Sequence, residues 1–204
     1  MKQGQTYMKN RRIRLLVSVA VNSCLLLWLL GSASADSPDP KSTVEALLGA
    51  VETLSKGDKD NPDPAVTRRI SQIIDIAGVS QSCLLDTWQK LPKSEQENFL
   101  SLFRQVLEEV AYPNSAKFFK STKVEIEQVK VDGDRAEVET VVTHPEEGMV
   151  EVGYRLKLLD KQWLLEDVLL DGVSLVTDLR SQMQKILREQ SYEELKRRMR
   201  EKLG

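Results

Sequence analysis

The sequence predicts an α+β protein with a curved, four-stranded antiparallel sheet meander flanked by N- and C-terminal helices, cone-like with an apolar cavity. Three observations lead to this fold class. Apolar residues recur at helical spacing before residue 112 and after residue 175, but with a period of two between residues 123 and 158. Short turn signals such as Asp132-Gly133 separate the alternating segments. The last strand segment, residues 163–170, is apolar on both faces, which is typical of a strand that is covered on both sides or lines a cavity.

Residues 1–35 have the features of an export signal. A basic start without acidic residues precedes an apolar run at 15–30, and Ala-Ser-Ala at 33–35 supplies the small-residue cleavage pattern. A retained membrane anchor is the alternative, but the apolar run is short for a span, which usually needs about 20 apolar residues. Cleavage leaves residues 36–204, the size of a single domain.

The charge balance argues against nucleic acid as a partner. Five of the 29 Lys and Arg residues and none of the 31 Asp and Glu residues lie in residues 1–35, so removing this segment changes the formal net charge from −2 to −7. Such a chain repels a phosphate backbone. Only Cys83 remains as a cysteine, so the domain has no internal disulfide and must rest on its core.

The first predicted helix follows a cap at Ser42 or Thr43 and carries apolar residues at helical spacing. A loop rich in Gly, Asp, Asn and Pro at 56–64 ends it. The next two helices are predicted over residues 65–76 and 80–89.

A fourth helix is predicted to begin at Ser94, where Glu97 completes a capping box. Its apolar stripe at helical spacing indicates an amphipathic helix with one buried face. The residues of this stripe are Phe99, Phe103, Val106, Leu107 and Val110.

Four strands joined by short turns follow and predict an antiparallel meander. They cover residues 123–131, 135–143, 150–158 and 163–170. The alternation slips near Gln128, which indicates a β-bulge. In the last strand, strict alternation puts Leu165 and Leu169 on one face and Val168 and Leu170 on the other. An Asp171-Gly172 turn then leads into a helix over 175–188, and a last helix is capped by Ser191.

The sequence carries no recognisable catalytic set. Its one histidine, His144, lies in a predicted turn, no His, Cys and carboxylate cluster has metal-ligand spacing, and no glycine-rich phosphate loop precedes a helix. We therefore expect no metal, no cofactor and no enzymatic activity. One alternative remains, in which Asp167 acts as a base at the floor of the cavity, whereas the structural interpretation is that it caps a turn or pairs with a basic residue such as Arg180.

We expect the cavity to take an apolar ligand, because the inward face of the sheet has no partner toward the open end of the cone. Sequence does not separate cavity lining from ordinary core, so both uses fit the same positions. The predicted lining residues are Phe99, Phe103, Val138, Val142, Val152, Tyr154, Leu156, Trp163, Leu165, Val173 and Leu175.

One string of residues resembles a known family. W-x-x-x-D-x-x-x-D-G-V-S-L at 163–175, followed by L-R-S-Q-M at 179–183, resembles the MlaC family, the toluene-tolerance-type periplasmic phospholipid-binding proteins of Gram-negative bacteria. The resemblance covers roughly residues 44–203. Weaker matches that precede this string are Asp75, Trp88, Glu95, Gln96, Phe99 and Phe103.

The resemblance implies a monomeric periplasmic carrier that buries the acyl chains of one phospholipid. Such a carrier, an auxiliary component of an ABC transporter, shuttles lipid between an outer-membrane lipoprotein complex and an inner-membrane complex of ABC transporter and MCE-domain protein. This transport maintains outer-membrane lipid asymmetry. Two alternatives stay open beside the Asp167 enzyme, namely a carrier of a hopanoid or another apolar ligand, and an export-linked adaptor that binds partners through its helices.

Overall fold

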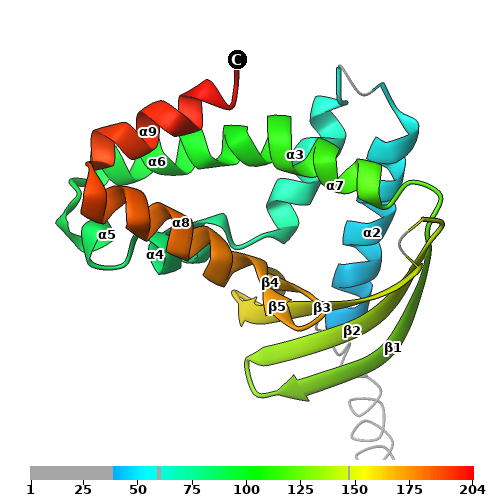
Figure 1. The fold of residues 1–204 in the computed structure, drawn as a ribbon. Helices are drawn as coiled ribbons and strands as arrows, with labels where there is room; N and C mark the ends of the chain where they lie inside the picture. The colour runs from blue at the N-terminus through cyan, green and yellow to red at the C-terminus, as the bar shows by residue number, and fades with distance from the viewer. Residues whose placement is uncertain (1–38, 59–60, 147) are drawn as a thin grey trace, which may run out of the picture. The chain divides into compact units, whose positions relative to one another are not determined.

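The computed structural model describes residues 39–58, 61–146 and 148–204, so the export signal predicted over residues 1–35 lies outside the described residues. Helices precede and follow one antiparallel sheet, which confirms the predicted α+β class (Figure 1). None of the helices in the described ranges is both long and apolar enough to cross a membrane.

The helical segments before the sheet run close together in sequence, and η1 is a π-helical turn that joins α6 to α7. They are α2 (Pro40–Lys56), α3 (Pro64–Ile73), α4 (Ile76–Leu84), α5 (Asp86–Lys90), α6 (Lys93–Val106), η1 (Leu107–Ala111) and α7 (Tyr112–Phe118). The apolar stripe of the fourth predicted helix reaches Val110 in η1, whereas the continuation into α7 is absent from the sequence-based prediction.

The first helix begins before the predicted Ser42 or Thr43 cap, which is therefore wrong. Asp39 is the N-cap of α2, and its carboxylate accepts a hydrogen bond from the backbone N–H of Lys41 at 3.2 Å. Pro40 occupies the first turn, where its missing N–H costs nothing and its fixed φ suits the helix. Asp63 caps α3 before Pro64 in the same way.

The helices α4 and α6 also begin at other residues than predicted. Asp75 caps α4 by accepting the Gly78 N–H at 2.8 Å, and α4 stops before Leu85, whose φ of 50° is incompatible with a continuing helix. The capping box at Ser94 is wrong, since α6 starts after Pro92 without a side-chain cap.

The sheet is a meander in the order β1-β2-β3-β4-β5, with all neighbours antiparallel. The strands are β1 (Lys123–Asp132), β2 (Arg135–His144), β3 (Gly148–Leu159), β4 (Gln162–Leu170) and β5 (Val173–Ser174). The two-residue β5 adds a short edge to the four predicted strands. The register between β1 and β2 shifts between Ile126 and Gln128, which confirms the predicted bulge.

A second bulge explains why β4 is apolar on both faces in its sequence. Arg155 pairs with Asp167 and Leu156 pairs with Leu165, so Glu166 has no partner on β3. The extra residue shifts the alternation by one position. The predicted division of faces is therefore wrong beyond this point.

After the bulge, Val168 and Leu170 lie opposite Tyr154 and Val152 and pack against the same core as Leu165. Leu169 instead lies opposite Gly153 on the other face. Most of the apolar residues of β4 thus share one face of the sheet.

The chain ends with α8 (Leu175–Glu189) and α9 (Tyr192–Glu201), and its apolar side chains form two cores. We call the first the sheet cluster, because it lies between one face of the sheet and α2, α3 and α7. We call the second the helical cluster, because α4, α6, α8 and α9 form it. Figure 1 shows α2 lying against the sheet and the second group of helices gathered beyond the end of β4.

Candidate functional site

Seven of the predicted lining residues come together in the sheet cluster. They are no more than 6 % exposed and face the apolar side of α2, which contributes Val44, Leu47 and Val51. The seven are Val138, Val142, Val152, Tyr154, Leu156, Trp163 and Leu165.

The other four predicted residues lie elsewhere. Phe99 and Phe103 stack on each other in the helical cluster, with ring centroids 6.0 Å apart. Val173 in β5 and Leu175 at the start of α8 are 63 % and 44 % exposed. The structure thus does not bring these four residues to the sheet cluster.

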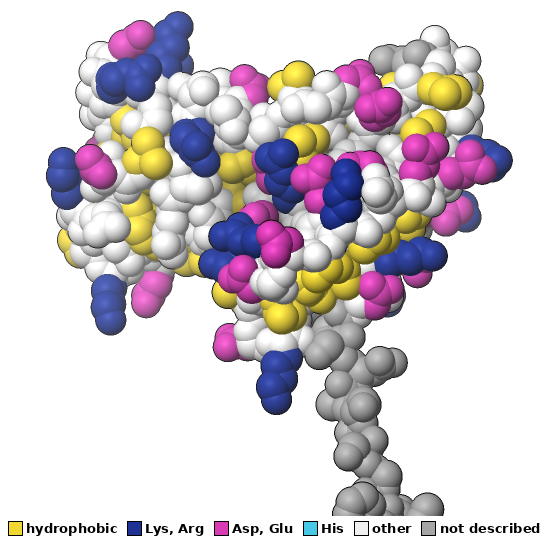
Figure 2. Space-filling model, turned by 90° about the horizontal axis from the view of Figure 1, so that it is seen from below, with side chains coloured by type: hydrophobic (Ala, Val, Ile, Leu, Met, Phe, Trp, Pro, Cys, Tyr) yellow, Lys and Arg dark blue, Asp and Glu magenta, His cyan; other side chains and the backbone are white. Residues whose placement is uncertain are grey.

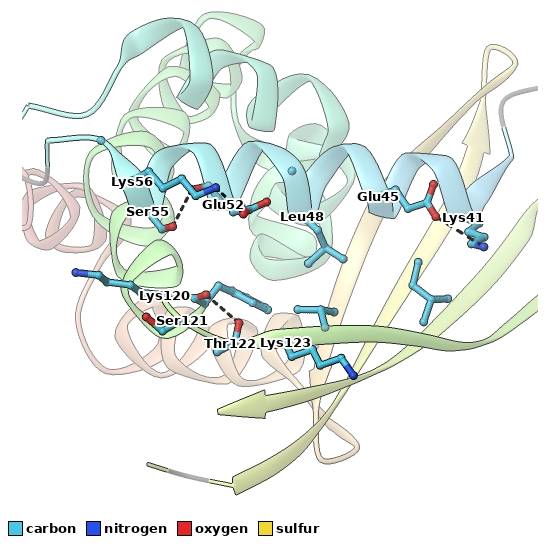
Figure 3. Close-up of a pocket in the computed structure, with 15 residues that line it drawn as sticks. Lys41, Glu45, Leu48, Glu52, Ser55, Lys56, Lys120, Ser121, Thr122 and Lys123 are labelled. Atoms are coloured by element: carbon cyan, nitrogen blue, oxygen red, sulfur yellow. Dashed lines mark hydrogen bonds and ion pairs between the residues drawn. The ribbon is translucent and has the colours of Figure 1, made fainter. Parts of the chain in front are cut away.

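A groove of about 1130 Å³ runs between α2 and the segment that joins α7 to β1 (Figure 3). Sequence reasoning missed it, because its two walls are about 70 residues apart along the chain and only the fold brings them together. Its lining residues are Lys41, Glu45, Leu48, Gly49, Glu52, Ser55, Lys56, Gly57, Phe119, Lys120, Ser121, Thr122, Lys123, Val124 and Ile126.

The floor of the groove is apolar and continuous with the sheet cluster. Leu48 from α2 and Phe119, Val124 and Ile126 from the opposite wall are partly buried and pack directly against that cluster. Gly49 leaves open space on α2, since a Cβ there would have no atom within 4 Å. The helix α2 therefore uses one face for the core and a second face for the groove.

Beyond the cover of α2, the inward face of the sheet stays partly open. Val129 and Val131 of β1 lie opposite the buried Val138 and Ala136, yet they are 36 % and 57 % exposed. Figure 2 shows a band of apolar side chains on the face of the molecule seen from below, flanked by charged side chains. The inward face of β1 thus remains partly exposed beside the sheet cluster.

Lysine side chains predominate over carboxylates along the groove. Lys41 and Lys56 pair with Glu45 and Glu52 on α2, at 3.7 and 2.7 Å. On the opposite wall, Lys123 pairs with Glu125, which does not line the groove. Lys120 has no ion pair within the described part of the chain. Four lysines against two glutamates give the groove a positive excess on a negatively charged domain.

The Asp167 carboxylate is hydrogen-bonded at the junction between β4 and α8. It accepts hydrogen bonds from the Val168 and Val176 N–H groups at 2.9 and 3.1 Å and from the Ser174 hydroxyl at 2.6 Å. Arg180 does not pair with it but donates to the Ser82 carbonyl at 2.7 Å. These bonds support the turn-capping interpretation of Asp167 over its use as a base.

The other two residues that could take part in chemistry, His144 and Cys83, are held in packing contacts. His144 stacks on Phe118, with ring centroids 5.3 Å apart, and burial raises the pKa of the Cys83 thiol. In the ranges that the structure describes, no group of three or more His, Cys, Asp or Glu side chains is placed to hold a metal ion.

Two buried tyrosines lie in the sheet cluster and differ in their partners. The Tyr112 hydroxyl is hydrogen-bonded to the Ser71 hydroxyl at 3.1 Å, and burial raises the pKa of Tyr112 to about 12. Burial also raises the pKa of Tyr154, but the Tyr154 hydroxyl makes no hydrogen bond to any residue that the structure describes.

Fold and groove together define a class of protein, namely a small α+β protein in which a helix on an open antiparallel sheet leaves a groove into an apolar core. The family model described as MlaC protein matches residues 41–201, so the chain belongs to the MlaC family. This membership confirms the family that the motif at 163–183 indicates.

The fold also matches a solved structure. The phospholipid-binding protein from Ralstonia solanacearum, solved in complex with a phospholipid, aligns with a TM-score of 0.65 and 17 % sequence identity. The alignment covers 79 % of this chain and 93 % of that one, and the likeness shows a shared fold. A comparison with curated proteins finds no match.

Proposed function

We propose that the protein is a phospholipid carrier without catalytic activity and that the groove between α2 and β1 admits the lipid. The observation that carries this proposal is the groove of about 1130 Å³ whose apolar floor joins the sheet cluster. Ligand pockets typically measure about 300–1,000 Å³, so the groove has room for long acyl chains. Membership of the MlaC family and the phospholipid in the Ralstonia solanacearum structure support the same cargo.

The chemistry of the groove matches the two ends of a phospholipid. The acyl chains contact Leu48, Phe119 and Ile126 and enter between α2 and the sheet, toward the seven predicted lining residues of the sheet cluster. The phosphate stays at the lysine-lined rim, where Lys120 has no competing carboxylate among the described residues. Charge-assisted contacts of this kind favour an anionic group.

The energetics suit a carrier. Each buried CH₂ contributes about 0.8 kcal/mol relative to water. A membrane offers the chains nearly the same gain, so transfer between membrane and protein has a small net free energy. The carrier therefore needs no nucleotide site of its own in order to release its cargo.

We place this carrier in the periplasm, as a single domain of residues 36–204 released by cleavage of the signal over 1–35. Its partners are an outer-membrane lipoprotein complex and an inner-membrane ABC transporter with an MCE-domain protein. Lipid shuttling between them maintains outer-membrane asymmetry. Family membership supports these assignments.

The test is to purify the exported protein, to extract its lipids and to identify them by mass spectrometry. We expect phospholipid in the extract, and uptake of phospholipid from labelled vesicles by protein that has been stripped of lipid. A polycyclic triterpenoid in place of phospholipid would change the assigned cargo. Absence of any lipid, together with no uptake from vesicles, would contradict the carrier function.

A further inference from the structure

An unsatisfied hydroxyl group lies inside the sheet cluster. Tyr154 is 3 % exposed, and its Oη makes no hydrogen bond with any other described residue. Buried polar groups in proteins nearly always have a partner, because burial removes the water that would otherwise bond to them. The Tyr154 hydroxyl is therefore available to a partner from outside the chain.

Its polar neighbour on the adjacent strand is Thr140, whose hydroxyl keeps its acceptor lone pairs while it donates its own hydrogen. Thr140 is 2 % exposed, and its hydroxyl donates to the Val152 carbonyl at 2.9 Å. The Thr140 hydroxyl is near enough to lower the pKa of Tyr154 against the larger rise that burial causes, although the two hydroxyls make no hydrogen bond of ordinary geometry. Thr140 and Tyr154 thus form a small polar pair on a face of the sheet that is otherwise apolar.

Tyr112 shows that the fold can satisfy a buried tyrosine in the same core. It is 5 % exposed and bonds to the Ser71 hydroxyl, which in turn donates to the Glu108 carboxylate at 2.8 Å. The two tyrosines differ in partner and not in burial. The missing partner of Tyr154 is therefore a local feature of this site.

The polar pair lies directly behind the floor of the groove. Ile126, which lines the groove, is the cross-strand partner of Thr140. Thr140 is in turn the partner of Val152, two residues from Tyr154 along β3. A lipid that enters from the groove meets this pair first as it passes over the sheet.

We propose, on the basis of the carrier function above, that the Tyr154 hydroxyl donates a hydrogen bond to an ester carbonyl of the bound diacyl lipid, so that the protein selects ester-linked over ether-linked chains. Ester carbonyls stand where the acyl chains begin, and they are the strong acceptors of that part of the molecule. An ether-linked lipid lacks the carbonyl and leaves the hydroxyl unpaired. Such a bond is strengthened by the low dielectric of the core.

In the experiment, the exported protein is stripped of lipid and then mixed with vesicles. The vesicles contain two phosphatidylglycerols in equal amounts. The two lipids have the same headgroup and chain length, and one is ester-linked and the other ether-linked. After re-isolation, the bound lipids are counted by mass spectrometry for wild type, Tyr154→Phe and Tyr112→Phe. Comparison between variants cancels any difference in how readily the two lipids leave the vesicle.

We expect the ratio of ester to ether lipid to be about three- to tenfold higher in the wild type than in Tyr154→Phe, the range for one net hydrogen bond. Tyr112→Phe serves as the matched control and should keep the wild-type ratio, since its hydroxyl has a partner within the chain. Tyr154→Phe removes one oxygen that makes no bond, so we expect it to fold.

Equal ratios in the wild type and Tyr154→Phe, with both lipids loaded, would overturn this inference and leave the carrier function intact. A water molecule or the Thr140 hydroxyl as the partner of Tyr154 would give this result, since neither distinguishes the two lipids. If neither lipid loads, the carrier function fails and the inference fails with it.

Discussion

The two cores of this protein differ in whether their buried polar groups have hydrogen-bond partners. In the helical cluster, the buried polar groups have partners within the chain. Lys196, which is 6 % exposed, pairs with Glu95 and Glu193 at 2.9 and 2.8 Å, and Gln184 donates to the Cys83 carbonyl at 2.8 Å. The sheet cluster has an unpaired hydroxyl at Tyr154 and adjoins a groove.

This difference indicates that the two cores have different functions. A core with all its groups paired resists rearrangement, because any opening leaves polar groups unsatisfied. A core with open sides and an unsatisfied group can accept a guest molecule. We infer that the helical cluster stabilises the fold and that the sheet cluster receives the lipid.

The sharpest test of the comparison removes one aromatic ring from each region. Phe99 is fully buried between Trp88, Phe103 and Tyr192, so Phe99→Ala should lower the free energy of unfolding by about 3–5 kcal/mol. Phe119→Ala at the groove should cost about 1 kcal/mol in stability, since its ring is only partly buried. Urea denaturation measures both values.

Lipid loading should respond in the opposite order. Per folded molecule, Phe99→Ala keeps the wild-type lipid content, whereas Phe119→Ala reduces it. A loss of lipid in Phe99→Ala without loss in Phe119→Ala would reverse the roles that we assign to the two cores.

A second test fills the groove. Gly49→Leu places a side chain into open space on α2 and should lower lipid loading by about tenfold, equivalent to about 1.4 kcal/mol. Stability should rise by up to about 1 kcal/mol, because glycine is a poor helix former. Thr53→Leu, on an exposed part of α2 that does not line the groove, is the control and should leave loading unchanged. Equal loading by Gly49→Leu and the wild type would exclude this groove as the entrance.

The smallest predicted effect is the pH dependence of the ion pair that secures α9. Lys196 lowers the pKa of Glu95, and Glu193 and Glu95 raise the pKa of Lys196. The pair therefore stabilises the fold fully between pH values of about 5 and 10. This contribution is lost as the pH falls through the lowered pKa of Glu95, or rises through the raised pKa of Lys196.

Lys196→Met should accordingly destabilise the protein at pH 7 by about 1 kcal/mol, the net value of one hydrogen bond, and much less at pH 2. The control is Lys56→Met, which breaks the exposed pair with Glu52 and should change stability little at either pH. Urea midpoints at the two pH values give the comparison. An equal loss for Lys196→Met at both would show that packing, and not charge, explains its effect.

Much of the fold follows from local patterns in the sequence. The switch of period after residue 122 predicts the sheet, and the slip near Gln128 predicts its first bulge, because both depend on neighbouring residues. The Glu166 bulge escaped prediction, since an apolar strand shows no break in alternation when one residue is inserted. The start of α2 was missed because Asp39, Ser42 and Thr43 are all residues that commonly cap a helix, and the choice of Ser42 or Thr43 overlooked Pro40 as a first helical residue.

The site was less predictable than the fold. Apolar periodicity shows that Phe99 and Val138 are buried, but it does not show that they belong to different cores. The groove depends on the approach of Leu48 to Val124 and Ile126, which no local pattern encodes. Tyr154 was predicted to be a lining residue, but its unpaired hydroxyl emerges only from the structure.

The polar residues of the motif at 163–175 hold the junction between the sheet and α8. Asp167 ties β4 to α8, the Asp171 carboxylate accepts the Glu151 N–H at 3.0 Å, and Ser174 caps α8. Each of these bonds serves the joint between sheet and helix, and none of these residues lines the groove.

The polar positions of the string that marks family membership therefore serve the architecture and not the cargo. Proteins that share these positions can be grouped by fold, whereas the lipid that each one carries should follow from the residues at 41–57 and 119–126 and from the residue at the position of Tyr154.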